Sequence, residues 1–280
     1  MSCAIGAELG QERSDVATGL EFAPLGFALM KPSIACRVSG LCIALLAAFA
    51  SGPGFAERLT REQIAQRLAG GTTDFSNLEA PGANLSGLDF AGASLFGANL
   101  RGADLSNAKL SRCNLNVAIL RDAVLVNADL REAKLFSSVL ANANLRGADL
   151  RGARMMGNFE GANLEGANLQ GVKGGSDMRN QPMGLIRLVL VRARLQGAIL
   201  RGADLSRADL SFADLRKADL GHADLTRAKL VGADLTGATL AEATLSGAEI
   251  HGAIFKSIVG MSTARGLDAA EGREAAIYDD

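Results

Sequence analysis

The feature that most constrains this chain is a large apolar residue at every fifth position over most of its length. From Leu85 to Leu150 each fifth residue is Leu except Phe90, and from Leu190 to Phe255 each is Leu, Ile or Phe. The residue two places earlier is Ala in 11 of 14 repeats of the first stretch and in 13 of 14 of the second. A period of five matches neither the ~3.6 residues of a helix nor the ~2.0 of a strand. The chain must therefore turn once in every repeat.

Each repeat divides into two inward and three outward positions. The large residue and the small residue two places before it can both face an interior. The other three positions carry Asn, Asp, Arg, Ser, Thr and Gly, as in Ala103-Asp104-Leu105-Ser106-Asn107. Asn, Asp and Gly adopt turn conformations at low cost. We therefore expect a corner at every repeat and stacked coils around one narrow apolar interior.

Units such as Ala148-Asp149-Leu150-Arg151-Gly152 resemble the A(D/N)LXX unit of the pentapeptide-repeat family. The resemblance covers residues 73–256. It implies an all-β fold, a right-handed quadrilateral parallel β-helix with four repeats per coil. About eight and a half coils at a spacing of ~4.8 Å would give a solenoid ~40 Å long.

The register of the repeats is interrupted once. Met155 and Phe159 are four residues apart, and residues 170–189 lose the pattern before it returns at Leu190. Because 35 residues, or seven whole repeats, separate Met155 from Leu190, the second stretch is expected to re-enter in phase with the first. We predict one continuous solenoid with an irregular surface loop at 170–189, and the sequence leaves open whether that loop binds a partner.

Segments at both ends of the solenoid are expected to cover it, because an end coil has an open apolar face. Thr60 and Gln63 have the spacing of a capping box, and apolar Ile64 and Leu68 are four residues apart. This pattern predicts a short helix over 60–69 within an N-terminal cap at 57–72. Residues 257–280 start with apolar residues and end polar, which predicts a C-terminal cap and tail.

The first 56 residues have the composition of a targeting segment. Lys31 and Arg37 precede an uncharged apolar run at 41–50, and small residues follow as far as Ala56, which is the order of a secretory signal peptide. The ten residues of that run are too few to span a membrane. We predict a signal peptide at 30–56, a mature chain from Glu57 without a transmembrane span, and export to the bacterial periplasm or the extracellular space. Residues 1–29 then precede a second candidate start at Met30, and the sequence leaves the true start open.

The balance of charge argues against nucleic acid as a partner. Removing residues 1–56 takes away three of the 29 Lys and Arg residues and four of the 30 Asp and Glu residues, which leaves 26 of each sign. A neutral mature chain has no overall field that would steer it to nucleic acid or imitate it. The best-known pentapeptide-repeat proteins resemble duplex DNA in shape and charge and block bacterial topoisomerases. Neutrality and the export signal separate this chain from that role.

No group of residues in the sequence indicates an enzyme, a cofactor or a metal site. His222 and His251 are 29 residues apart, which on a 20-residue coil places them on different sides. Cys113 stands at an inward small position and is interpreted as a buried thiol. The Asp residues before the central Leu recur once per side and are interpreted as turn formers.

One group of outward residues is apolar. Scattered exposed apolar residues are ordinary, whereas a contiguous patch marks an interface. Counting 20 residues per coil brings five such residues together as a candidate surface for a protein partner or a second copy of the chain. We call them the apolar patch: Phe96, Val117, Ile119, Phe136 and Val139.

The same count stacks three arginines, which we call the basic strip: Arg187, Arg207 and Arg227. They would suit an anionic cell-envelope glycan or lipid headgroup. Partner, biological process and oligomeric state are left open by the sequence. We predict a non-enzymatic exported protein whose β-helix presents a surface for protein–protein association, with polyanion binding through the arginines as the alternative. High salt would weaken the second contact and spare the first.

Overall fold

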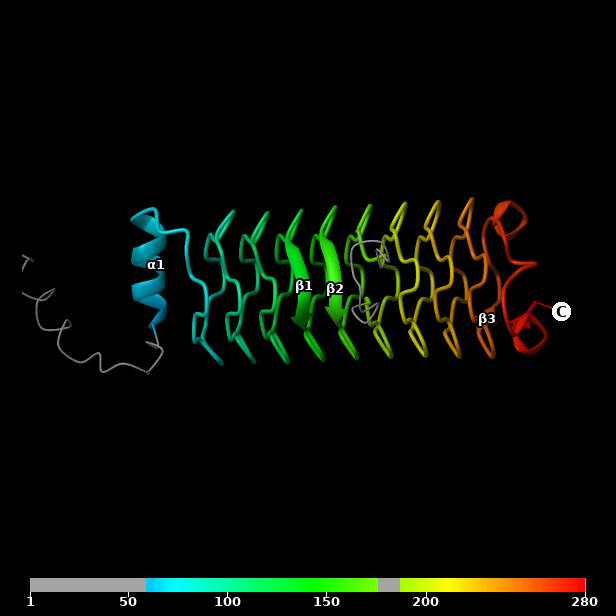
Figure 1. Cartoon of the computed structure of the whole chain (residues 1–280), viewed down its shortest axis with the longest axis horizontal. Coiled ribbons are helices and arrows are strands. Elements are labelled where there is room, and N and C mark those ends of the chain that lie inside the picture. Colours follow the sequence, from blue (N-terminus) through cyan, green and yellow to red (C-terminus); the bar gives the residue numbers. More distant parts are fainter. Residues whose placement is uncertain (1–58, 176–186, 280) are drawn as a thin grey trace, which may run out of the picture. The chain divides into compact units, whose positions relative to one another are not determined.

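The computed structural model describes residues 59–175 and 187–279, which lie in one compact unit, Gly54–Asp280. The predicted signal peptide at 30–56, the residues before it and the middle of the 170–189 loop lie outside the described residues. Within the unit the chain winds as a stack of coils between α1 (Arg61–Ala69) and the C-terminal end (Figure 1). Successive coils are joined by parallel bridges.

The bridging residues define four sides of the coil. The residue before each central Leu pairs with its equivalent one coil further along. We number the sides in chain order, so that sides 2, 3 and 4 start at Glu79, Asn84 and Asp89, and we call the corner between sides 1 and 2 the first corner. Side 1 stacks Asp74, Ser94, Asn114, Lys134, Arg154, Lys173, Asp204, Asp224, Thr244 and Arg265.

The polar residues of the repeat explain its corners. The Asp or Asn before the central Leu accepts the backbone N–H two residues further on, as Asp104 does from Ser106 at 2.9 Å. The carbonyl of Leu105 accepts the N–H of Ala108 at 3.0 Å, which closes a β-turn. The third residue of that turn, Asn107, has a φ of 56°, a region that Gly, Asn and Asp enter most easily. The Asp and Asn residues therefore serve the turns.

The core is a column of Leu and Ala. The central Leu and the Ala two places before it are buried along the stack, and each buried Leu contributes roughly 1.5–3 kcal/mol. Cys113 occupies one Ala position, is fully buried, and its Sγ donates to the carbonyl of Phe90 at 2.7 Å. Burial raises the pKa of the Cys113 thiol to about 12. The thiol is therefore a packing group.

Continuous strands are few because each side contributes one bridging residue between two turns. β1 (Lys134–Val139) and β2 (Arg154–Asn158) form a parallel pair that runs through the first corner. At the C-terminal end β3 (Ile254–Phe255) pairs with β4 (Ile277–Tyr278), also in parallel. The expected all-β character thus takes the form of stacked bridges with short strands.

The four-residue repeat is accommodated between β1 and β2. Phe136 pairs with Met156, but Ser138 pairs with Gly157, so Ser137 is an extra residue bulged out of β1. Gly157 is buried, and a Cβ there would clash with the backbone carbonyl of Ser138. Only Gly fits at this place, because the two backbones approach so closely.

The coil continues across the 170–189 segment with fewer sides than the sequence count predicted. Lys173 is the last bridging residue before the segment and lies on side 1, whereas Val189 is the first after it and lies on side 2. Met155 and Leu190 are therefore separated by five sides rather than seven, and the predicted phase is wrong. The count fails because it assumes one side for every five residues, whereas Lys173 and Val189 occupy consecutive sides although they are 16 positions apart in the sequence.

α1 packs on the first coil. Gln63 donates its backbone N–H to the Thr60 hydroxyl at 3.3 Å, and the Gln63 side chain accepts the Thr60 N–H at 2.7 Å, which is a capping box. Ile64 is fully buried in the core. Arg61 Nη1 donates to the carbonyl of Asn84 at 2.8 Å. The helix therefore covers apolar surface that the first coil would otherwise expose.

The bridges extend past residue 256, where the repeats were expected to end. Val259, Arg265 and Glu271 continue sides 4, 1 and 2, and β4 continues side 3. The ring of Tyr278 stacks on Phe255 with centroids 5.7 Å apart. Residues 257–279 therefore form a last, widened coil that covers the core. Two 3₁₀ turns widen it, η1 (Met261–Thr263) and η2 (Arg273–Ala275).

Candidate interaction surface at the first corner

The residues of the apolar patch lie on side 1, at the first corner and on side 2. Phe96 and Phe136 follow the central residues of side 1, Val117 lies at the first corner on the coil between them, and Ile119 and Val139 are bridged to each other on side 2. The first four named are exposed by 43%, 36%, 47% and 42%, and Val139 is half-buried. The core therefore does not fully bury these large apolar side chains.

Val117 has a backbone conformation that its side chain disfavours. Its φ is 62°, and it is the only β-branched residue among the described non-Gly residues with positive φ. The left-handed region costs an L-residue roughly 1–2 kcal/mol, and β-branched residues are rare there. Asn or Gly, which three other coils carry at the same corner (Asn77, Gly97 and Gly247), would be more stable. Strain of this kind concentrates at functional sites.

A shallow hollow opens beside Phe136 on side 1. It is lined by Phe136, Met156, Asn116, Lys134 and Arg154. The Phe136 N–H donates to Asn116 Oδ1 at 2.9 Å, which fixes the backbone beneath the ring. Met156 is absent from the apolar patch predicted from the sequence, although a count of 20 residues from Phe136 reaches it. The hollow places apolar and cationic groups in one site.

Three cations stack along side 1, and we call them the basic ladder. Lys134 bridges Arg154, and Arg154 bridges Lys173. All three are exposed, and none makes an ion pair within the described residues. A count of 20 residues per coil does not predict this ladder, because Arg154 and Lys173 are 19 residues apart, across the four-residue repeat. Stacked like charges repel, so this arrangement does not serve the coil.

The basic strip lies at the same corner as the apolar patch. Arg187, Arg207 and Arg227 each stand two residues before a member of the side 2 stack. Arg187 and Arg227 are exposed, Arg207 is half-buried, and no ion pair joins any of them to another described residue. Arg207 and Arg227 line a second shallow hollow together with Asp224. A strict count of 20 residues per coil would put the strip on the corner opposite Val117. Because the coil has two fewer sides between Met155 and Leu190 than that count assumes, the strip lies at the first corner.

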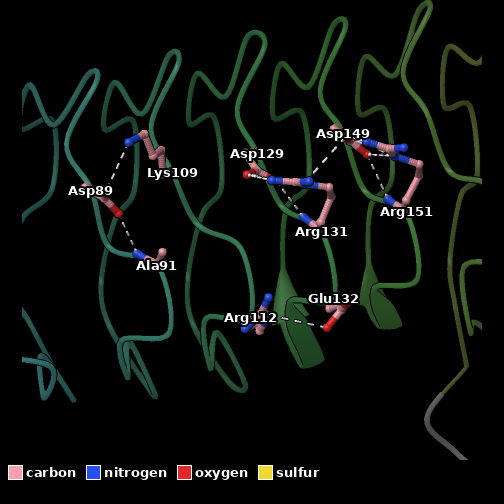
Figure 2. A network of polar contacts seen from close by, with 9 residues as sticks. All are labelled: Asp89, Ala91, Lys109, Arg112, Asp129, Arg131, Glu132, Asp149 and Arg151. Carbon is pink, nitrogen blue, oxygen red and sulfur yellow. Dashed lines mark hydrogen bonds and ion pairs between the residues drawn. The ribbon is translucent and has the colours of Figure 1, made fainter.

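Side 4 and the corner that follows it are neutralised instead (Figure 2). Arg131 Nη2 lies 2.7 Å from Asp129 Oδ2, and Arg151 Nη2 lies 2.6 Å from Asp149 Oδ2. Arg131 also lies 3.9 Å from Asp149 on the next coil. The hydrogen bonds from Arg131 and Arg151 hold the pKa of Asp129 and Asp149 below the usual range. Each of these charges has its partner on the same protein surface.

Groups that could support catalysis stay apart. His222 lies on the corner after side 4, with Nδ1 3.3 Å from Glu242 Oε2, whereas His251 lies on the corner after side 2. Within residues 59–175 and 187–279 no three His, Cys, Asp or Glu side chains gather closely enough to hold a metal ion. None of the helices in the same ranges is long and apolar enough to cross a membrane.

Comparison with protein families identifies the repeat. The model described as Pentapeptide repeats matches in eight copies, over residues 73–107, 98–135, 118–157, 138–173, 189–227 and 218–256. No curated protein matches the chain.

Several solved structures are similar to the chain. HetL, a pentapeptide repeat protein involved in heterocyst differentiation regulation from the cyanobacterium Nostoc sp. strain PCC 7120, is 31% identical over 79% of this chain and 100% of its own, with a TM-score of 0.40. QnrB1, a plasmid-mediated fluoroquinolone resistance protein, is 16% identical over 72% of this chain and 91% of its own, with a TM-score of 0.35. A pentapeptide repeat protein of the Arabidopsis thaliana thylakoid lumen is 27% identical over 58% of this chain and 68% of its own, with a TM-score of 0.22.

Proposed function

This chain belongs to the pentapeptide-repeat family, and from that premise we propose that it is a non-enzymatic interaction protein whose binding surface is the first corner with the adjoining parts of sides 1 and 2. The surface comprises the apolar patch and Met156. Its occupant is a protein partner. The coil is the scaffold that holds these side chains at a fixed spacing.

The observation that carries the proposal is the exposure of large apolar side chains on adjacent coils. Phe96, Val117, Ile119 and Phe136 are each more than one-third exposed, although the core of Leu and Ala is complete without them. Contiguous apolar surface of this kind is characteristic of an interface. The strain at Val117 supports the same conclusion, since Gly or Asn would serve the turn at a lower cost than Val.

The test replaces apolar patch residues and compares the result with a more exposed Phe elsewhere. Phe96→Ser combined with Phe136→Ser should leave the melting temperature almost unchanged and reduce association. Association is measured by light scattering for self-association and by cross-linking capture for a partner. Phe212→Ser is the control, because Phe212 is 57% exposed on the corner after side 2. A double variant that melts earlier and keeps its associations would assign these rings to the fold and reject the proposal.

Export is a further part of the proposal. Its support is the order of charged, apolar and small residues at 30–56. N-terminal sequencing of the native protein should find a chain that starts near Glu57 and lies outside the cytoplasm. A cytoplasmic chain that retains residues 41–50 would reject this part and leave the interaction surface untouched.

A further inference from the structure

We propose that the partner binds through an acidic polypeptide segment that also carries apolar side chains. This inference rests on the proposed function and adds the partner's chemistry to it. The apolar residues of the segment occupy the hollow beside Phe136, and its carboxylates lie over the basic ladder.

The hollow is lined by both apolar and cationic side chains. Phe136 and Met156 offer apolar surface, and Lys134 and Arg154 stand at its edge. A ligand that fills the hollow with an apolar group therefore has its neighbouring groups beside two cations. Carboxylates at those places would form charge-assisted hydrogen bonds, which are stronger than neutral ones.

The cations of the ladder have no partner within the described surface. Lys134, Arg154 and Lys173 are exposed and stacked at the spacing of the coils, where like charges repel. On side 4 the equivalent stack contains Asp129 and Asp149, and each is paired with an arginine. An acidic ligand would neutralise the positive charges of the ladder, as the arginines neutralise Asp129 and Asp149 on side 4.

The basic strip extends the same surface. Met156 and Arg207 lie two coils apart along the first corner, or ~10 Å at the usual spacing of strands. From Phe96 to Arg227 the surface spans six coil spacings, about 29 Å, which an extended segment of about nine residues covers. In the sequence, residues 176–186, which the structure does not describe, lie between the apolar patch and the strip. The main contact is therefore assigned to the patch, hollow and ladder, and the strip is its extension.

A polypeptide fits this surface better than a uniform polyanion. A glycan or polyphosphate has no apolar side chains for Phe96, Val117 or Phe136, which are the most unusual feature of the corner. Asp204 and Asp224 also lie on side 1 next to the strip, and Asp224 lines its hollow. They would repel a continuously charged polymer, whereas a polypeptide can place its carboxylates only where the cations are.

The experiment measures the binding of three labelled nine-residue peptides to the purified chain by fluorescence anisotropy. One peptide alternates Glu and Leu, one alternates Lys and Leu, and one alternates Glu and Ser. Heparin and vesicles with anionic headgroups serve as two further probes. We expect the Glu–Leu peptide to bind at least tenfold more tightly than the other two peptides and to weaken with salt.

Two pairs of variants separate the contributions. Lys134→Glu with Arg154→Glu should weaken Glu–Leu binding at least tenfold. The matched control is Arg101→Glu with Arg121→Glu, which makes the same charge change at exposed and half-exposed arginines beyond side 2 and should leave binding unchanged. Phe96→Ser with Phe136→Ser should also weaken it.

Other outcomes overturn the inference in distinguishable ways. Equal binding of the Lys–Leu peptide means a purely apolar surface, so the acidic partner is rejected and the proposed function stands. If no peptide binds but the patch variants lose self-association, the occupant is a second copy of the chain. The acidic partner is then rejected, and the proposed function stands. Heparin, vesicle or Glu–Ser binding that is insensitive to the patch variants rejects both the inference and the proposed function.

Discussion

Side 4 and the first corner are built from the same repeat, yet their outer surfaces differ. On side 4, Asp129 and Asp149 accept turn N–H groups and pair with Arg131 and Arg151, so every charge in that network is compensated (Figure 2). At the first corner the turn of one coil is interrupted by the bulge at Ser137, and exposed apolar and cationic side chains replace the paired charges.

The difference between the two regions shows which residues stabilise the coil and which do not. A residue that follows the repeat, such as Asp149, satisfies the backbone and its neighbours at once. A residue that departs from it, such as Val117 or Arg154, leaves strain or charge uncompensated within the described surface. Because the residues that depart from the repeat gather at one corner, they indicate a surface that a binding partner covers.

The largest effects should be the same in both regions, because they share one core. Leu130→Asp beneath side 4 and Leu135→Asp beneath side 1 each bury an unpaired charge at a fully buried position. Each should lower the free energy of unfolding by about 3–5 kcal/mol in urea melts. Gln170→Glu, an exposed change next to a buried Leu, should be nearly neutral. A mild effect of either core variant would show that the inward assignment is wrong.

The bulge should make the first corner sensitive to a single methyl group. Gly157→Ala places a Cβ against the Ser138 carbonyl and should cost up to about 3 kcal/mol of unfolding free energy. Gly152→Ala is the comparison, because Gly152 has a φ of 66° but a Cβ there would meet only Glu132 Cγ at an ordinary contact distance of 3.7 Å, and about 1 kcal/mol is expected there. Equal losses in thermal melts would mean that the close approach at the bulge is not the constraint.

The ion pairs of side 4 should appear in the pH dependence of stability. Because the pKa of Asp129 and Asp149 in the folded state lies below the ordinary value of 3.8, their contribution is complete above that pH and is lost as the pH falls through the lowered values. Arg131→Gln with Arg151→Gln should therefore lower the melting temperature slightly at pH 7, and by progressively less as the pH falls below 3.8. Melting temperatures across this range measure it, and a gap that stays constant would contradict the pairing.

The regular part of this fold can be predicted from the sequence, because the residue types within each repeat show which positions face inward and which face outward. The Leu and Ala of Ala148-Asp149-Leu150 face inward, and Asp149 serves its turn. The phase across 170–189 could not be predicted, because the repeat pattern is absent there and counting residues assumes one side per five residues, whereas Lys173 and Val189 occupy consecutive sides. The basic ladder was missed for a related reason, since Arg154 and Lys173 align only after the four-residue repeat is allowed for.

The most direct test of the account is a change that separates the turn from the surface. Val117→Asn replaces a strained exposed Val by a residue that other corners use at positive φ, such as Asn107. The account predicts that unfolding free energy rises by up to about 1 kcal/mol while association, measured by light scattering and cross-linking capture, becomes weaker. A variant that loses stability and associates as before would contradict it.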